Sequence, residues 1–332
     1  MRFIHDTHDM KETEYNRPDL NRWFVIVNPV AGMGRGLQDF PLISKLLRNS
    51  EIQCEPVFTE RTSHAVELTV KAVVDGYRKI MVIGGDGTLH EVVNGLFIQN
   101  SVKPDEVLLA VIPVGTGNDW IKMFGIPTRY NDAVQAIKDG YSFLQDVGEV
   151  TYEEAQYRQK RYMANVAGSG FDACVVRHFN HEKAKGRKGN RLYLWSIIRS
   201  FFTYKSAGMK VCVDGKVVYN DLLFSIAVGI GKYNGGGIQQ LPAAAPDDGL
   251  LDMTIIRPIH WWHIIFRLHK LFNGQIYSIG HTMHVQGSRI TITSSPDSIL
   301  EVDGELLGYT PLEFGILHRA VRVIVSKKFI GE

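Results

Sequence analysis

Three short apolar runs, each followed by a glycine-rich turn and then by apolar residues at helical spacing, constrain the fold of this chain most. The runs cover residues 23–27, 80–83 and 107–112. Because strands that alternate with helices imply right-handed crossovers, this pattern predicts a mostly parallel sheet with helices on both faces, a three-layer α/β domain. Ligands of such sheets bind beyond the carboxyl ends of the strands, which is where the three turns lie.

A different pattern begins near Asp146, where short alternating segments replace these units. Antiparallel strands are predicted at residues 210–218, 222–229, 251–256, 289–293 and 321–325. Helices are expected at residues 190–204 and from His260 onward. A length of 332 residues also favours two domains. We therefore expect a disordered extension at residues 1–21, an α/β domain at 22–146 and a β-rich domain at 147–318.

Composition and cysteine content narrow the class of protein. The formal net charge of +2 argues against a dedicated nucleic-acid binder. Cys54, Cys174 and Cys212 are odd in number and far apart, which fits neither a disulfide framework nor a zinc site and predicts a reducing cytoplasm. The first 21 residues lack the pattern of a signal peptide, and the apolar runs fall short of the roughly 18 residues that would span a bilayer. Any membrane contact is therefore expected to be peripheral.

Among the three glycine turns, the turn from Gly84 to Thr88, GGDGT, has the residues that most clearly suit a ligand site. Glycines let the backbone approach a ligand closely, and the helix that follows offers unpaired N–H groups and a positive dipole end to an anion. The turn is therefore a candidate phosphate site, and the Asp86 carboxylate could hold Mg²⁺ beside the phosphates. The alternative is a tight turn in which Asp86 only caps the helix at residues 88–95.

Two further glycine turns follow the third and first strands. GTGND at residues 115–119 again combines a threonine donor with a carboxylate, whereas NPVAG at residues 28–32 is a common turn that says little alone. The following GMGRG lacks the spacing of a dinucleotide fingerprint, and the chain has no P-loop motif. The chain is therefore expected to hold phosphates without a P-loop lysine.

An acidic pair near the end of the chain is the candidate for proton transfer. Asp303 and Glu305 are two residues apart, and on an extended segment they would point to the same face. Two like charges held close together can supply a proton acceptor that works near neutral pH. A solvated Asp-Gly turn is the alternative that the sequence alone leaves open.

The motifs NPVAG, GGDGT and GTGND, with PDDGLLD at residues 246–252 and VDGE at 302–305, resemble the diacylglycerol kinase catalytic-domain family in order and spacing. That family includes bacterial lipid kinases and the sphingosine and ceramide kinases. The resemblance covers most of the chain from about Trp23. It implies an α/β nucleotide-binding domain, then a β-sandwich lipid-substrate domain with the active site in the cleft between them. The final strand, at about residues 319–332, would return to the first domain.

The resemblance also implies the residues of the site. Those expected around ATP are Asn28, Pro29, Val30, Ala31, Gly32, Thr59, Gly84, Gly85, Asp86, Gly87, Thr88, Leu89, His90 and Thr116. Those expected to hold Mg²⁺ are Asp86 and Asp119 at a catalytic ion, through water, and Asp248 with the carbonyls of Ala245 and Leu250 at a structural ion. Without the resemblance, residues 247–249 indicate an Asp-Gly hairpin turn.

The general base of the family lies in the VDGE motif. Glu305 is the favoured acceptor here, with Asp303 as its orienting partner or its rival. His90 stands where many members have asparagine, and this departure is expected to alter the nucleotide contacts modestly. The third residue expected to act in catalysis is Asp86.

The resemblance predicts an ATP-dependent kinase that transfers the γ-phosphoryl group to the primary hydroxyl of a membrane lipid, such as diacylglycerol or a sphingoid or ceramide lipid. The alternatives are an NAD kinase, which shares GGDGT and a β-rich second domain, and a non-catalytic lipid-binding relative. The sequence does not choose the lipid alcohol, and a homodimer is compatible with it.

A basic segment followed by an apolar one suggests contact with an anionic membrane surface. Residues 177–210 contain nine Lys or Arg against the single acid Glu182, and LYLWSIIRSFF lies within them from Leu192. A solvated loop leading into a buried helix is the alternative. Five further residues could line a lipid slot, although packing is the stronger expectation for most of them: Trp261, Trp262, Ile264, Ile265 and Phe266.

Overall fold

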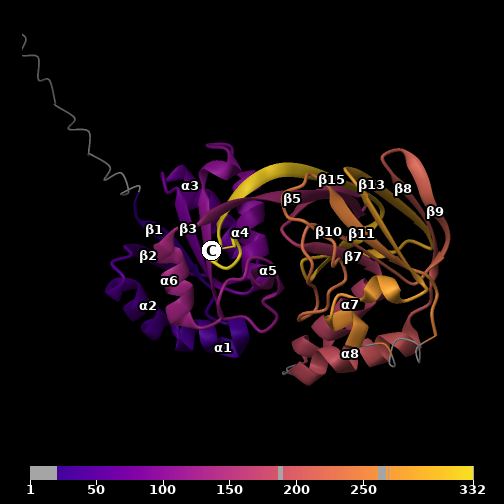
Figure 1. The fold of residues 1–332 in the computed structure, drawn as a ribbon, viewed down its shortest axis with the longest axis horizontal. Helices are drawn as coiled ribbons and strands as arrows, with labels where there is room; N and C mark the ends of the chain where they lie inside the picture. The colour runs from indigo at the N-terminus through magenta and orange to yellow at the C-terminus, as the bar shows by residue number, and fades with distance from the viewer. Residues whose placement is uncertain (1–20, 186–189, 261–266, 268, 332) are drawn as a thin grey trace, which may run out of the picture.

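The computed structural model describes residues 21–185, 190–260, 267 and 269–331. Within these residues the chain forms an α/β lobe and a β-rich lobe, joined by two long strands that run across both (Figure 1). The predicted extension lies outside the described residues except for Asn21.

The α/β lobe is built on parallel strands in the order β2-β1-β3-β4. These strands are β1 (Trp23–Val27), β2 (Cys54–Phe58), β3 (Lys79–Gly84) and β4 (Leu108–Pro113). All of β1 is buried, and β3 and β4 are buried from their second residue onward. Continuous buried runs are typical of parallel strands that are covered on both faces, so the predicted α/β class is confirmed.

Helices cover both faces of this sheet. One core contains Leu68 of α3 and Val92 of α4, and the other contains Ile43 of α2 and Ile137 of α6. The helices of this lobe are α1 (Ala31–Gln38), α2 (Phe40–Asn49), α3 (His64–Val74), α4 (Asp86–Ile98), the 3₁₀ turn η1 (Pro104–Glu106), α5 (Asp119–Met123) and α6 (Tyr130–Asp139).

The β-rich lobe is a sandwich whose two layers share one strand. One layer has the order β12-β11-β10-β7-β14-β15, and in the other β9-β8-β13 and β6-β5 lie on either side of β15. Its remaining elements are β6 (Tyr157–Met163), β7 (Val166–Gly170), α7 (Phe171–Ala184), α8 (Asn190–Thr203), β8 (Ala207–Val213), β9 (Lys216–Leu223), β10 (Ser225–Gly229), β11 (Leu251–Ile256), the 3₁₀ turn η2 (Ile276–Ser278), β12 (Thr282–Gly287), β13 (Arg289–Ser295) and β14 (Ile299–Val302).

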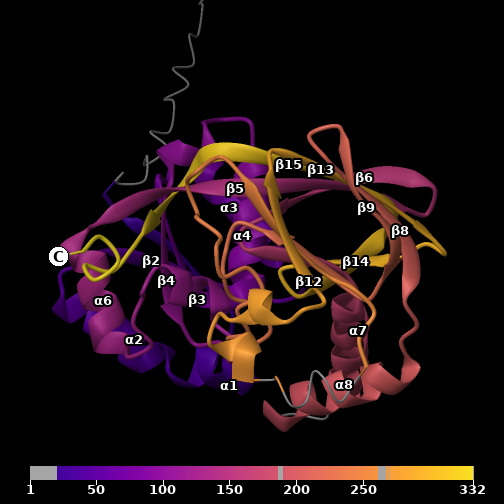
Figure 2. The same cartoon turned by 45° about the vertical axis from the view of Figure 1, so that its right-hand side comes forward.

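The strand β15 (Glu305–Ile324) belongs to both lobes. It pairs with β14 at its start, with β13 and with β5 (Ser142–Glu154) along its length, and in parallel with β4 at its end. Figure 2 shows β5 and β15 running together from one lobe to the other. The predicted return of the last strand to the first lobe is confirmed, since Arg322 and Val323 pair with Leu108 and Leu109.

Two predicted elements differ in extent from what the structure describes. Residues 210–218 were predicted as one strand, which is wrong: β8 ends at Val213 and β9 begins at Lys216. Asp214 and Gly215 both have positive φ there, as a tight hairpin turn requires. The helix predicted from His260 is seen at residues 267 and 269–272, whereas Trp261, Trp262, Ile264, Ile265 and Phe266 lie outside the described residues.

In the part of the chain that the structure describes, no helix has both the length and the apolar character needed to cross a bilayer.

Candidate active site

The three glycine turns follow β1, β3 and β4 and are bonded to one another. Asn28 Nδ2 donates to Thr88 Oγ1 at 2.9 Å, which joins the first turn to the second. The amides of Val114 and Gly115 donate to the Gly84 carbonyl at 2.9 and 3.2 Å, which joins the third turn to the second. The loops predicted to hold phosphates are therefore brought together at one edge of the sheet.

Close backbone approach explains why glycines occur here. Gly32 has φ +59°, and a Cβ at this residue would lie 1.9 Å from the Val114 carbonyl oxygen. A Cβ at Gly85 would lie 3.2 Å from Gly115 Cα, whereas one at Gly87 would meet open space. The first turn of α4 is therefore open beside Gly87, and its unpaired N–H groups favour an anion.

Asp86 holds the third turn and does not cap its own helix. The residue at the N-cap of α4 is Gly85, and the Asp86 carboxylate accepts the amides of Asp119 and Trp120, both at 3.1 Å. The capping alternative is therefore wrong. Burial, and then the charge of nearby Asp119, raises the pKa of Asp86 to about 6. A buried carboxylate with a second acid close by is a place where a bound cation would offset repulsion.

The surroundings of Asp86 fit a hydrated magnesium ion. Asp119 Oδ1 accepts from Lys122 Nζ at 2.7 Å, and its Oδ2 accepts from the Gly236 amide, also at 2.7 Å. Asn118 Oδ1 is buried beside Gly115 and receives no hydrogen bond from the described residues. With the carboxylate oxygens already accepting amides and an ammonium group, a magnesium ion with a water shell fits better than a bare one. Within the described ranges, no three His, Cys, Asp or Glu side chains form a metal cluster.

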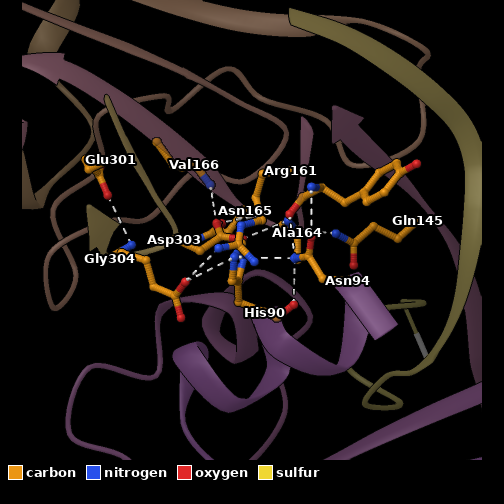
Figure 3. Close-up of polar contacts among 12 residues, drawn as sticks. His90, Asn94, Gln145, Arg161, Ala164, Asn165, Val166, Glu301, Asp303 and Gly304 are labelled. Atoms are coloured by element: carbon orange, nitrogen blue, oxygen red, sulfur yellow. Dashed lines mark hydrogen bonds and ion pairs between the residues drawn. The ribbon is translucent and has the colours of Figure 1, made fainter. Parts of the chain in front are cut away.

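The turn that contains Asp303 joins β14 to β15 and is held by the backbone of residues 164–166 (Figure 3). Asp303 Oδ1 accepts the amides of Asn165 and Val166 at 3.1 and 3.0 Å, and its Oδ2 accepts the Ala164 amide at 2.9 Å. Asp303 has φ +48° and Gly304 has φ +88°. The expectation of an extended segment was therefore wrong, because three amides from a distant part of the chain fix a turn here.

His90 nevertheless brings the two carboxylates together. Its Nδ1 lies 2.8 Å from Asp303 Oδ2, and its Nε2 lies 3.7 Å from Glu305 Oε2. Asn94 Nδ2 lies 3.3 Å from Nε2, but it also donates to the carbonyls of His90 and Tyr162, both at 2.9 Å, and this uses both amide hydrogens. The Nε2 side of the ring is thus left to Glu305. The ring faces the acidic turn, so any contact of His90 with a nucleotide would come from its backbone.

Glu305 is the accessible member of the pair. Its side chain keeps 31% of its surface, against 3% for Asp303, and its other charged neighbour is Arg161, at 3.7 Å. An acceptor with long, adjustable contacts can take a proton from a substrate hydroxyl. Asp303, with four short contacts, is instead suited to holding the turn and His90 in place.

Contacts between α4 and β6 place the candidate phosphate turn, Gly84 to Thr88, against the acidic turn, Asp303 to Glu305. Asn94 Oδ1 accepts the Tyr162 amide at 3.0 Å while its amide group donates to the Tyr162 carbonyl. Phe97 stacks on the Tyr162 ring with centroids 4.4 Å apart. Since Asp86 begins α4 and His90 lies one turn later, this helix fixes both halves of the site.

The remaining predicted residues are placed as follows. Thr59 is buried after β2, where its amide donates to Val27 O at 2.8 Å, and Thr116 is exposed in the third turn. Asp248 is exposed, and its Oδ1 accepts the Leu250 amide at 3.0 Å. The turn at residues 247–249 leads into β11 and does not connect paired strands, so it is not a hairpin. The structural magnesium site stays a prediction.

Three features of the site were missed from the sequence. Lys122 pairs with Asp119, and Arg161 lies near Glu305. The loop of Gly235, Gly236 and Gly237, all with positive φ, brings the Gly236 amide from the second lobe to Asp119 in the first. The run of three glycines in the sequence indicates close backbone approach, whereas nothing in the sequence indicates that Lys122 and Arg161 belong to the site.

Two family models match this chain. The model of the diacylglycerol kinase catalytic domain matches residues 22–150, and that of the YegS C-terminal NAD kinase beta sandwich-like domain matches residues 165–325. Diacylglycerol kinases of Staphylococcus aureus strains RF122 and MRSA252 are each 26% identical over 308 residues, which is 93% of this chain and 93% of each relative.

Solved structures agree with these matches. A candidate diacylglycerol kinase from Bacillus anthracis superposes with a TM-score of 0.73 at 25% identity, covering 93% of this chain and 98% of that one. A yeast NADH kinase superposes with a TM-score of 0.55 at 10% identity, covering 95% and 88%, and shares the fold alone.

Proposed function

Because this chain belongs to the diacylglycerol kinase catalytic-domain family, we propose that it transfers the γ-phosphoryl group of ATP to the primary hydroxyl of a membrane lipid. Diacylglycerol and the sphingoid and ceramide lipids are the candidate acceptors. The observation that carries the proposal is the double role of α4, which begins at Asp86 in the phosphate turn and carries His90, 2.8 Å from Asp303 in the acidic turn. A phosphate donor and a hydroxyl acceptor would meet between these two turns.

Each half of the site has a role in this reaction. The amides at the start of α4, with the turns that follow β1 and β4, bind and orient the phosphates, since a helix N-terminus favours negative charge. Asp303 and His90 orient the acidic turn. Glu305 takes the proton of the lipid hydroxyl as its oxygen attacks the γ-phosphorus in line, and the bond to the β–γ bridging oxygen breaks so that ADP leaves with its electron pair. Magnesium, held through water by Asp86 and Asp119, would supply positive charge to the transferring phosphoryl oxygens.

An assay with labelled ATP tests the proposal. The purified protein, incubated with MgATP and mixed micelles that contain diacylglycerol, monoacylglycerol, a sphingoid base or ceramide, should transfer label to at least one lipid. NAD is assayed in parallel, because an NAD kinase is the alternative function and a yeast NADH kinase shares the fold. Conversion of NAD to NADP without any labelled lipid would overturn the proposal in favour of that alternative. Nucleotide binding with no labelled product would favour a non-catalytic relative.

We also propose that the enzyme works from the cytoplasm, peripherally bound to an anionic membrane through α8. Trp195, Ile198 and Phe202 keep 51%, 41% and 76% of their surface and recur at helical spacing on one side of α8. Arg199 lies among them with 43% of its side chain exposed. The helix lies at the end of the β-rich lobe, beside α7 (Figure 1). Exposed aromatic and aliphatic side chains interleaved with cations favour an anionic lipid surface.

Removing two of these apolar side chains should weaken membrane binding. The double variant Trp195→Gln, Phe202→Gln is expected to bind phosphatidylglycerol-containing vesicles about tenfold more weakly than the wild type in co-sedimentation. The matched control is Ile98→Gln at the end of α4, a residue that is 55% exposed in the other lobe. Equal binding of the double variant and the control would rule α8 out as the membrane contact.

A further inference from the structure

Glu301 is a buried acid beside the acidic turn, and the proposed reaction gives it no role. It lies in β14 with 1% of its surface exposed. Its Oε2 accepts the Gly304 amide at 3.0 Å (Figure 3), and Gly304 directly precedes Glu305, the proposed base. The carboxyl of Glu301 is therefore joined to the base through one hydrogen bond and one peptide bond.

The contact with Gly304 fixes a peptide that could otherwise flip. Asp303 and Gly304 form a two-residue hairpin loop, because Val302 pairs with Glu305 and both loop residues have positive φ. Tight hairpin turns come in two types, which differ in the orientation of the central peptide. By accepting the Gly304 N–H, Glu301 favours one orientation. A flip of this peptide would change the twist of the hairpin and move the side chain of Glu305, which begins β15.

The surroundings of Glu301 favour an uncharged carboxyl. Its Oε1 is buried and has no hydrogen-bond partner among the described residues. Gly168 separates it from Asp172 of α7: a Cβ at Gly168 would lie 2.9 Å from Glu301 Oε1 and 3.0 Å from Asp172 Cβ. Burial, and then the charge of Asp172, raises the pKa of Glu301 to about 8. Near neutral pH the carboxyl therefore keeps a proton on Oε1, while its Oε2 accepts the amide.

Ionisation of Glu301 would disturb the turn. The titratable groups that face Glu301 or its turn come from α7, α4, β6 and the turn itself: Asp172, His90, Arg161, Asp303 and Glu305. The neighbouring strand β7 contributes none. The two basic groups lie beside Asp303 and Glu305, so a charged Glu301 would face the carboxylate of Asp172. Repulsion between the two would drive the Glu301 side chain out of its place, and the peptide that it holds would move with it.

We propose that Glu301 in its neutral form positions the base by holding the Gly304 amide, and that turnover is lost when this carboxyl ionises. The proposal rests on the proposed kinase function, in which Glu305 is the proton acceptor. It assigns a role to a buried residue that acts through the backbone of the turn and not on the substrates. The upper pH limit of the enzyme would thus be set beside the base and not by the base itself.

Two variants and a pH series test this role. Glu301→Leu removes the acceptor of the Gly304 amide and should lower kcat by about 10- to 10²-fold, with little change in the KM for ATP. Glu301→Gln keeps an uncharged acceptor and should rescue most of this loss. The wild-type kcat should fall as the pH rises through about 8, whereas the kcat of Glu301→Gln should not fall there. Glu154→Gln, an exposed matched change at the end of β5, should fall as the wild type does.

Crystal structures of Glu301→Leu and Glu301→Gln give a readout that needs no turnover. The turn at residues 303–305 should shift in the leucine variant and keep its place in the glutamine variant. If no lipid gains phosphate but the turn behaves in this way, Glu301 remains the residue that positions the turn and the kinase function fails. If the turn keeps its place in both variants, if Glu301→Leu retains wild-type kcat, or if Glu301→Gln loses kcat above pH 8 as the wild type does, the role of Glu301 is overturned.

Discussion

Asp86→Asn is expected to lower the turnover of MgATP-dependent phosphoryl transfer by about 10²- to 10³-fold, because it removes charge at the point where the phosphoryl group is transferred. The asparagine keeps the size of the side chain and one acceptor for the amides of Asp119 and Trp120. Turnover is measured with labelled ATP over a range of Mg²⁺ concentrations. Asp132→Asn, at an exposed aspartate of α6, is the matched control and should retain wild-type turnover.

Asp86→Asn should also change the thermal stability of the protein, and the size of this change should depend on pH. The ordinary pKa of 3.8 rises to about 6 for Asp86, so the folded chain holds this proton more tightly than the unfolded chain. The stability that the protonated form contributes is complete below pH 3.8 and is lost as the pH rises through about 6. Without divalent ions, the Tm of Asp86→Asn relative to the wild type should therefore increase across this range. Wild-type turnover by Asp86→Asn would contradict the assignment of Asp86 to the phosphate site.

Local sequence made the three glycine turns predictable. Gly32 adopts a positive φ, so the need for glycine arises from the backbone conformation of that residue itself. The strands before the turns are buried on both faces, and their continuous apolar runs in the sequence indicate this burial. Features that depend on neighbouring residues were thus correctly expected, as was the return of the last strand through the family resemblance.

The geometry of the acidic turn could not be predicted in the same way. The backbone at Asp303 is fixed by amides of Ala164, Asn165 and Val166, far away in the sequence. The sequence left an extended segment and a solvated Asp-Gly turn open. The turn exists, but it is held by buried backbone amides and is not solvated, and no pattern around Asp303 indicates those contacts. The two carboxylates lie beside different nitrogens of the His90 ring. This role of His90 depends on the packing of α4 against β6, which the sequence does not show.

The link between the lobes has a similar origin. Gly236 of the second lobe donates to Asp119 of the first, from a loop whose three glycines all have positive φ. Glycines at residues 235–237 indicate that some backbone approaches closely, but they do not say which one. The partner is set by β5 and β15, which connect the lobes and fix their separation. The second half of the site is thus a consequence of long-range strand pairing.

Glu305→Gln is expected to lower kcat by about 10²- to 10⁴-fold with little change in KM for ATP, because the variant loses the acceptor of the hydroxyl proton but no phosphate contact. Its Tm should match that of the wild type, since among the described residues the charged partners of the Glu305 side chain, His90 and Arg161, both lie 3.7 Å away. Turnover of the labelled lipid and thermal melting are measured on the same preparation. Glu154→Gln, at an exposed residue at the end of β5, is the matched control.

Asp303→Ala separates the roles of the two acids. Asp303 accepts three backbone amides and lies 2.8 Å from His90, so its loss leaves buried donors unpaired and should destabilise the fold by roughly 3 kcal/mol or more. A large loss of turnover at unchanged Tm in Glu305→Gln, together with a lowered Tm in Asp303→Ala, would identify Glu305 as the base and Asp303 as the residue that positions it. The assignment would be reversed if Glu305→Gln kept wild-type kcat while Asp303→Asn, correctly folded, lost it.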